Sequence, residues 1–238
     1  GRFFRATCPA QGVRHAPCDY NPLIHYKLYN SESMRDQTGK YPMMRNGEFG
    51  VQTPNNIDLL KRTIPPKSRF PINKKDPILI RKNMICAAFN DEVWLMPANI
   101  EQLFGKAETF EELIIAGQWM AAEGLRYAFD ALRLRTNIGG FTNWCLNEPW
   151  PNGAGSFIVD YEACPLPVFY AVGQSMKSIS ICLKYDSILY DIFDGLKAEI
   201  FLVNDGDSEV EKLHWSYILR DRHGDIYGSG SGVSDIGL

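Results

Sequence analysis

The sequence predicts an α/β protein in two parts, with alternating helices and buried strands followed by short antiparallel strands. In the first part, residues 109–146 show a long amphipathic helix, a Gly139-Gly140 turn and an apolar strand. This is the helix-to-strand step of a parallel sheet that is covered by helices. After about residue 177 the pattern changes to short alternating segments separated by turn residues, which is typical of antiparallel β-structure.

The early elements follow from local signals. Residues 1–8 are mostly apolar and favour a short strand, whereas residues 9–44 are rich in turn-forming residues and predict a long irregular connection. Residues 43–49 favour a strand, and residues 53–62 favour a short helix that ends before a pair of prolines.

The clearest helix begins at Thr109. Thr109 and Glu112 have the spacing of a capping box, in which the hydroxyl and the carboxylate accept hydrogen bonds from free backbone N–H groups at the helix start. Small and apolar residues then recur at helical spacing, and Arg133 complements the helix dipole at the far end. A buried strand over 141–146 and a short helix over 167–176 complete this part.

The last part is expected to be antiparallel. Residues 179–183, 198–203 and 214–219 alternate as strands do, and the glycine-rich run 228–232 favours a flexible segment. A seven-strand sandwich takes about 100 residues. We therefore expect residues 177–238 to form only the start of such a domain.

The composition argues against several classes of function. The 238 residues carry 25 Lys+Arg against 28 Asp+Glu, so no polybasic face indicates nucleic acid or an anionic membrane as partner. No apolar run approaches the roughly 20 residues of a membrane span. The six cysteines contain no Cys-x-x-Cys pair and the four histidines show no ligand spacing. We therefore expect buried free thiols, with no metal and no cofactor.

Two motifs bring carboxylates to strand ends. The first is Arg45-Asn46-Gly47-Glu48-Phe49-Gly50, and the second is Asn143-Trp144-Cys145-Leu146-Asn147-Glu148-Pro149-Trp150-Pro151. Each is apolar up to a carboxylate and is then broken by Gly or Pro. This pattern is typical of a strand that delivers an acid to the rim of a barrel.

Glu48 suits the role of a nucleophile. Hydrolysis of a glycosidic bond with retention needs two carboxyl groups about 5 Å apart, one acting as nucleophile and the other as proton donor. Glu48 follows a strand, and Gly47 and Gly50 leave the backbone thin enough for a substrate to approach. The alternative is a structural ion pair between Glu48 and an arginine such as Arg45.

The second motif is interpreted as a substrate contact. Many retaining (β/α)8 glycosidases carry their acid/base in an Asn-Glu-Pro triplet, but that triplet precedes the nucleophile, whereas Asn147-Glu148-Pro149 follows Glu48. We therefore expect Glu148 near the substrate and the proton donor outside these residues. Trp144 is either a core aromatic or the floor on which a sugar ring stacks.

These motifs resemble the β-mannosidase-like branch of glycoside hydrolase family 2. That branch ends its barrel with a Trp-x-x-Asn-Asp/Glu-x-Trp-Pro element, then Asp-Tyr and a proline-rich helix start; the matching residues are Trp144, Asn147, Glu148, Trp150, Pro151, Asp160, Tyr161 and Pro165–Tyr170. Its nucleophile lies in a Ser/Thr-Glu-Phe/Tyr-Gly element, matched by residues 47–50 with Gly at the first position. Residues 12–22 resemble the loop after strand six of endo-β-mannosidase and exo-glucosaminidase relatives.

The resemblance implies that the chain consists of parts of two domains. Residues 1–176 would be the C-terminal portion of a (β/α)8 TIM barrel, strands six to eight. Residues 177–238 would be the start of an immunoglobulin-like β-sandwich, a partial domain. Because three strands cannot close a barrel, the segment alone is expected to be inactive.

The resemblance also implies a retaining exo-β-glycosidase that hydrolyses β-mannosides or related β-linked sugars. Glu48 would be catalytic, and Trp144, Asn147 and Glu148 would bind the substrate. The partners would be the carbohydrate and the missing N-terminal part of the same protein, which would supply the acid/base. The alternatives are a catalytically inactive carbohydrate-binding relative and a structural interaction module.

Overall fold

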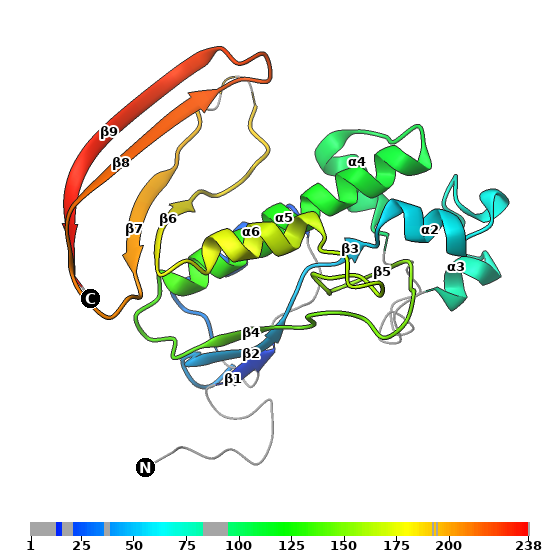
Figure 1. Cartoon of the computed structure of the whole chain (residues 1–238), viewed down its shortest axis with the longest axis horizontal. Helices are drawn as coiled ribbons and strands as arrows, with labels where there is room; N and C mark the ends of the chain where they lie inside the picture. Colours follow the sequence, from blue (N-terminus) through cyan, green and yellow to red (C-terminus); the bar gives the residue numbers. More distant parts are fainter. Residues whose placement is uncertain are drawn as a thin grey trace.

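The computed structural model describes residues 13–15, 21–35, 39–82, 95–191, 193 and 195–237. The fold is mixed α/β, as predicted. A small parallel sheet lies against a long helix, and two antiparallel hairpins curve away on the other side of that helix (Figure 1). The strand expected over residues 1–8 lies outside the described residues, as does most of the segment 12–22.

The parallel sheet has the order β1-β2-β4, formed by Val13–His15, Arg45–Phe49 and Phe141–Asn143. Both strand pairs are parallel, which confirms the prediction for this part of the chain. β4 is shorter than expected. After Asn143 the chain turns, the Asn143 side-chain amide donates to the Cys145 carbonyl oxygen at 2.8 Å, and the Trp144–Cys145 peptide bond is cis.

The long helix α5 (Phe110–Arg133) begins as the capping box predicts. The Thr109 hydroxyl accepts a hydrogen bond from the Glu112 amide at 3.1 Å, and the Glu112 carboxylate reaches back to the Glu108 amide at 2.8 Å. Its apolar face covers the sheet through aromatic contacts, with Phe129 packing 5.4 Å from Phe49 and 5.0 Å from Phe141 between ring centroids. Burial of these rings is the main contribution to docking helix and sheet.

Short elements surround the strand ends. A two-stranded antiparallel pair joins β3 (Thr53–Pro54) to β5 (Ala154–Gly155). The helix expected over 53–62 begins only at Ile57, because Asn56 provides the N-cap. This region also contains α2 (Ile57–Thr63), the 3-10 turn η1 (Pro66–Ser68), α3 (Pro77–Arg81) and α4 (Pro97–Phe104).

The segment expected to be irregular holds a helix, α1 (His25–Asn30), in addition to β1. α1 is anchored by rings rather than by caps, because no side chain caps its N-terminus. His25 is 4% exposed and lies among Tyr26, Tyr29 and Tyr127, with its Nε2 2.8 Å from the Gly124 carbonyl oxygen of α5. Burial lowers the pKa of His25 from 6.5 to about 4, although the Gly124 carbonyl and Glu123 oppose the shift.

This buried histidine predicts a loss of stability in mild acid. Between pH 6.5 and 4 the unfolded chain binds a proton at His25 and the folded chain does not, so the free energy of unfolding falls as pH falls. The contribution of His25 is about 2 kcal/mol between pH 7.5 and 5. Urea unfolding at several pH values should show a flatter pH dependence in His25→Gln than in the wild type. Parallel curves for the two proteins would contradict the assignment.

The second part of the chain begins after α6 (Pro167–Ser175). β6 (Ile179–Lys184) pairs antiparallel with β7 (Glu199–Asn204), and β8 (Val210–Arg220) pairs antiparallel with β9 (Ile226–Ile236). The antiparallel prediction is therefore confirmed.

The glycine-rich run is not a flexible segment but the middle of β9. Gly230 and Gly232 lie opposite Tyr217 and Trp215 in β8, and a Cβ added at either glycine would come within 2.5 Å of the facing ring. The glycines therefore allow two aromatic rings to lie flat across the neighbouring strand, which explains why a run without apolar side chains forms a strand.

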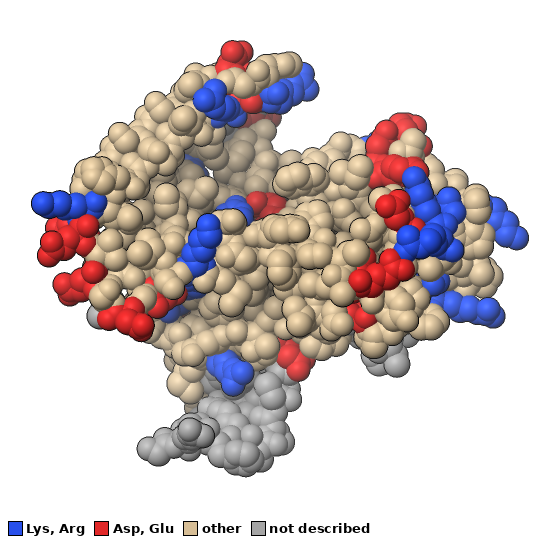
Figure 2. Space-filling view, in the orientation of Figure 1, with Lys and Arg blue, Asp and Glu red and all other residues tan. Residues whose placement is uncertain are grey.

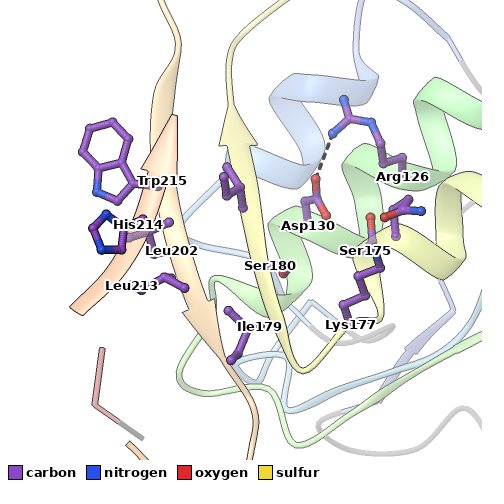
Figure 3. Close-up of a pocket in the computed structure, with 12 residues that line it drawn as sticks. Arg126, Asp130, Ser175, Lys177, Ile179, Ser180, Leu202, Leu213, His214 and Trp215 are labelled. Atoms are coloured by element: carbon purple, nitrogen blue, oxygen red, sulfur yellow. Dashed lines mark hydrogen bonds and ion pairs between the residues drawn. The ribbon is translucent and has the colours of Figure 1, made fainter. Parts of the chain in front are cut away.

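A network of buried polar groups joins α5 to the chain that follows β6. The Arg126 guanidinium pairs with Asp130 at 2.9 Å and with Glu123 at 3.0 Å, and it donates to the Tyr185 hydroxyl at 2.7 Å. The Tyr127 hydroxyl donates to the Tyr185 carbonyl oxygen at 2.7 Å. Beside this network, a pocket of about 380 Å³ opens between α5, α6, β6 and β8, and the Arg126–Asp130 pair lies at its helical wall (Figure 3).

The described cysteines, Cys145, Cys164 and Cys182, form no disulfide. Cys182 is buried as predicted, but Cys164 is exposed, so the expectation of burial is wrong there. Among the described residues, no helix has the length and apolar character needed to cross a bilayer.

Candidate active site

Glu48 lies at the C-terminal end of the central strand β2. Successive side chains of a strand point to opposite faces of a sheet, and the next residue, Phe49, packs under α5 against Phe129. Glu48 is therefore directed to the face opposite α5, where it is exposed. This is the strand end at which the sequence predicted a catalytic acid.

The predicted ion-pair alternative can be compared with the contacts of Arg45. The Arg45 guanidinium donates to the Thr142 hydroxyl of β4 at 3.5 Å. This contact helps to join β2 and β4. Glu48 itself is exposed at the C-terminal end of β2.

Trp144 is held beside the end of β2. Its backbone amide donates to the Phe49 carbonyl oxygen at 2.8 Å, so residue 144 extends the pairing of β2 and β4 one residue beyond the Phe49–Asn143 pair. The indole is partly buried against a second apolar cluster that includes Leu60, Ile64 and Ile114. Parallel pairing of β2 and β4 thus brings together two residues that are far apart in sequence.

Gly50 has a different role from the one expected. A Cβ at this position would come within 2.7 Å of both the Trp144 carbonyl oxygen and the Ser156 Cβ. The absence of a side chain at Gly50 therefore leaves room for the protein's own loop rather than for a substrate. It also allows Trp144 to lie close to β2.

Asn147 and Glu148 lie in the loop that follows β4, and they differ in environment. Asn147 is exposed and forms a bridge with Val159, whereas Glu148 is only 8% exposed. Burial raises the pKa of Glu148, and its Oε1 has no hydrogen-bond partner among the described residues. Burial thus disfavours the charged form of this carboxyl group relative to an exposed glutamate.

A residue that the sequence did not indicate fixes this loop. Lys82, just after α3, donates from Nζ to the Pro151 carbonyl oxygen at 2.8 Å, and its own carbonyl oxygen accepts from the Gly153 amide at 2.6 Å. The ammonium also lies 5.4 Å from the Trp150 ring centroid. These contacts span about 70 residues of sequence, so no local pattern could have revealed them.

In the described part of the chain, no group of three or more His, Cys, Asp or Glu side chains is placed to hold a metal ion. The arrangement offers instead one exposed carboxylate, a neighbouring tryptophan, and a loop with an exposed amide and a buried carboxyl group.

Comparisons with known proteins find the fold of this chain in solved structures of glycosidases. No protein-family model and no curated protein sequence matches the chain. A β-D-mannosidase from Dictyoglomus thermophilum matches over 92% of this chain and 24% of its own, with TM-score 0.61 and 15% identity. An exo-β-D-glucosaminidase, CsxA, matches over 94% and 25%, with TM-score 0.74 and 16% identity.

The exo-chitosanase CsxA from Amycolatopsis orientalis, in complex with PNP-β-D-glucosamine, matches over 93% of this chain and 25% of its own, with TM-score 0.73 and 17% identity. The chain thus spans about a quarter of the length of each matched structure. The resemblance to β-mannosidase-like glycosidases is confirmed at the level of the fold, which this chain shares with the corresponding part of these enzymes.

Proposed function

We propose that the chain is part of a retaining exo-β-glycosidase that acts on β-mannosides or related β-linked sugars, with Glu48 as its nucleophile. The observation that carries this proposal is the position of Glu48, exposed at the C-terminal end of a central parallel strand and opposite the helix-covered face. Catalytic residues of parallel α/β barrels lie at this end of the strands.

The proposed architecture follows from the same sheet. Residues 1–176 correspond to strands six to eight of a (β/α)8 barrel, and residues 177–238 to the start of an immunoglobulin-like domain. The fold likeness to a β-D-mannosidase and an exo-β-D-glucosaminidase supports this division. Because three strands cannot close a barrel, the open face that carries Glu48 is completed by other strands of the full-length protein.

The proposed chemistry uses two carboxyl groups. Glu48 attacks the anomeric carbon as the glycosidic bond breaks, and a carboxylic acid from another part of the full-length protein protonates the leaving oxygen. Water then hydrolyses the glycosyl–Glu48 ester, and the second group acts as the base. No metal or cofactor has a role in these steps.

Three residues are proposed to position the sugar. Trp144 supplies an apolar face beneath the ring, and Asn147, the exposed member of the Asn147-Glu148 pair, contacts hydroxyl groups directly. Glu148 donates a hydrogen bond from its neutral carboxyl group, which its buried position favours.

The proposal is tested by the stereochemistry of the first product. Proton NMR of the full-length protein with an aryl β-mannoside should show the β-anomer forming first, because two displacements retain configuration. First formation of the α-anomer would contradict a nucleophilic role for Glu48. The purified 238-residue chain should not turn over substrate, because the proposed proton donor lies outside it. Turnover by this chain that is lost in Glu48→Gln would refute an active site shared between this chain and the rest of the protein. A carbohydrate-binding relative without activity would retain ligand and form neither anomer.

A further inference from the structure

The loop over residues 148–151 contains two prolines, Pro149 and Pro151, which have no backbone N–H group to donate. This loop must therefore be held mainly through its carbonyl oxygens and its side chains. Asn147 before it and Gly153 after it are each held by backbone contacts to other segments. The two ends of the loop are thus fixed, whereas its middle depends on a donor from elsewhere in the chain.

Lys82 supplies this donor. Its Nζ donates to the Pro151 carbonyl oxygen at 2.8 Å and lies 5.4 Å from the centroid of the Trp150 ring. On the side of the molecule that carries α2, charged side chains of both signs lie together at the surface (Figure 2), and there Lys61 pairs with Glu111. Lys82 is directed instead to an uncharged acceptor, and burial lowers the pKa of its ammonium group. An ammonium donor makes a stronger hydrogen bond to a carbonyl oxygen than a neutral donor does.

The backbone that carries this ammonium group is itself well anchored. Lys82 directly follows α3, and its amide donates to the carbonyl oxygens of Ile78 and Leu79 at 3.1 and 3.0 Å. Leu79 is buried in the same apolar cluster against which Trp144 packs. The Lys82 carbonyl oxygen also accepts from the Gly153 amide at 2.6 Å. One residue therefore holds the loop through both its main chain and its side chain.

The position of the loop in turn determines where Glu148 lies. Glu148 is buried, and its Oε1 has no hydrogen-bond partner among the described residues. The carboxyl group is therefore oriented by packing and by the backbone that carries it. Because Pro149 and Pro151 have a fixed φ angle, a displacement at Pro151 is passed on to Glu148 rather than absorbed by rotation within the loop.

We propose that Lys82 is a positioning residue of the candidate active site, whose ammonium group holds the loop so that Asn147 and Glu148 are aligned with the sugar. This role rests on the proposed function, because these two residues are the proposed substrate contacts. Lys82 acts through the loop and does not touch the reacting atoms.

Steady-state kinetics of the full-length protein on the best aryl β-glycoside test this role. Lys82→Met keeps the apolar stem but loses the donor. It should raise KM at least ~10-fold with kcat within about threefold of the wild type, because sugar contacts made in both the ground state and the transition state are weakened. Lys82→Arg retains a cationic donor and should bring KM back to within about threefold of the wild type. Lys75→Met, at an exposed lysine before α3, is the matched control and should leave both parameters unchanged.

Amide hydrogen exchange measures the loop independently of activity. The peptide that covers residues 146–153 should exchange faster in Lys82→Met than in the wild type or in Lys75→Met. Circular dichroism verifies that each variant is folded, and Lys82→Gln, which is shorter and uncharged, provides the result if Lys82→Met does not fold.

A wild type that turns over its substrate with a KM that Lys82→Met leaves unchanged overturns the positioning role but not the proposed function. A fall in kcat at unchanged KM would make Lys82 a residue of the general structure and also overturns the positioning role, as does unchanged exchange of the loop. A wild type that turns over no β-glycoside contradicts the proposed function itself and the positioning role with it, even where Lys82→Met speeds exchange.

Discussion

The Glu48→Gln variant of the full-length protein is expected to lose activity on the order of 10⁴-fold or more in kcat. The amide is isosteric with the carboxylate but cannot form the glycosyl ester, so the first displacement has no nucleophile. Binding should change little, because the stacking face of Trp144 and the Asn147 amide are unaltered. Initial rates on the best aryl β-glycoside provide the measurement.

Two controls separate this effect from a general loss of structure. Glu101→Gln, at an exposed position of α4, should retain wild-type rates. Azide should restore part of the activity of a smaller variant, Glu48→Ala, because a small external nucleophile can occupy the vacated space. A Glu48→Gln enzyme within tenfold of the wild type would assign the nucleophile to another residue.

The Arg126→Met variant is expected to lower the free energy of unfolding by about 3 kcal/mol, because it removes the guanidinium that pairs with the buried Asp130 carboxylate. Asp130 is 2% exposed, and the Arg126 side chain is only 26% exposed. The same guanidinium binds Glu123 and the Tyr185 hydroxyl, so the substitution also weakens the junction between α5 and the segment after β6. Urea unfolding of the variant and the wild type measures the difference.

The pH dependence of this loss distinguishes a charge effect from lost packing. Burial already raises the pKa of Asp130, while Ser175 and Arg126 oppose that shift. Without Arg126 the folded-state pKa of Asp130 rises further, so at high pH the folded protein carries a buried charge that only Ser175, Cys182 and Arg133 still stabilise, whereas at low pH the group is neutral. The destabilisation should therefore be larger at pH 8 than at pH 5.

The exposed ion pair between Arg62 and Glu162 provides the matched control. Both side chains are about half exposed, so Arg62→Met should lower the free energy of unfolding far less than Arg126→Met does. Equal losses at Arg62 and Arg126, or a loss at Arg126 that does not change with pH, would contradict the role assigned to the buried network.

Local signals predicted the elements that depend on local interactions. The capping residues Thr109 and Glu112 and the helical spacing after them predicted α5, and the strands predicted over 43–49 and 141–146 correspond to β2 and to β4, which is shorter. Parallel pairing then followed from the helix-to-strand order. It also placed Trp144 beside the end of β2, because neighbouring parallel strands end at the same edge.

What sequence reasoning missed depends on partners far away in the chain. β9 forms because Gly230 and Gly232 lie beneath the rings of Tyr217 and Trp215, and a glycine run alone does not contain that information. The burial of Glu148 and the contacts of Lys82 with the loop at Pro151 arise only after α3 and the segment after β4 meet.

Covalent trapping of Glu48 tests the central claim most directly. A 2-deoxy-2-fluoro β-glycoside with a good leaving group should inactivate the full-length protein, because the fluorine slows hydrolysis of the glycosyl–enzyme ester. Peptide mass spectrometry should then find one fluoroglycosyl group on the peptide that contains Gly47-Glu48-Phe49-Gly50. A label on a different carboxylate, in an enzyme that turns over its substrate, would contradict the assignment of Glu48 as the nucleophile.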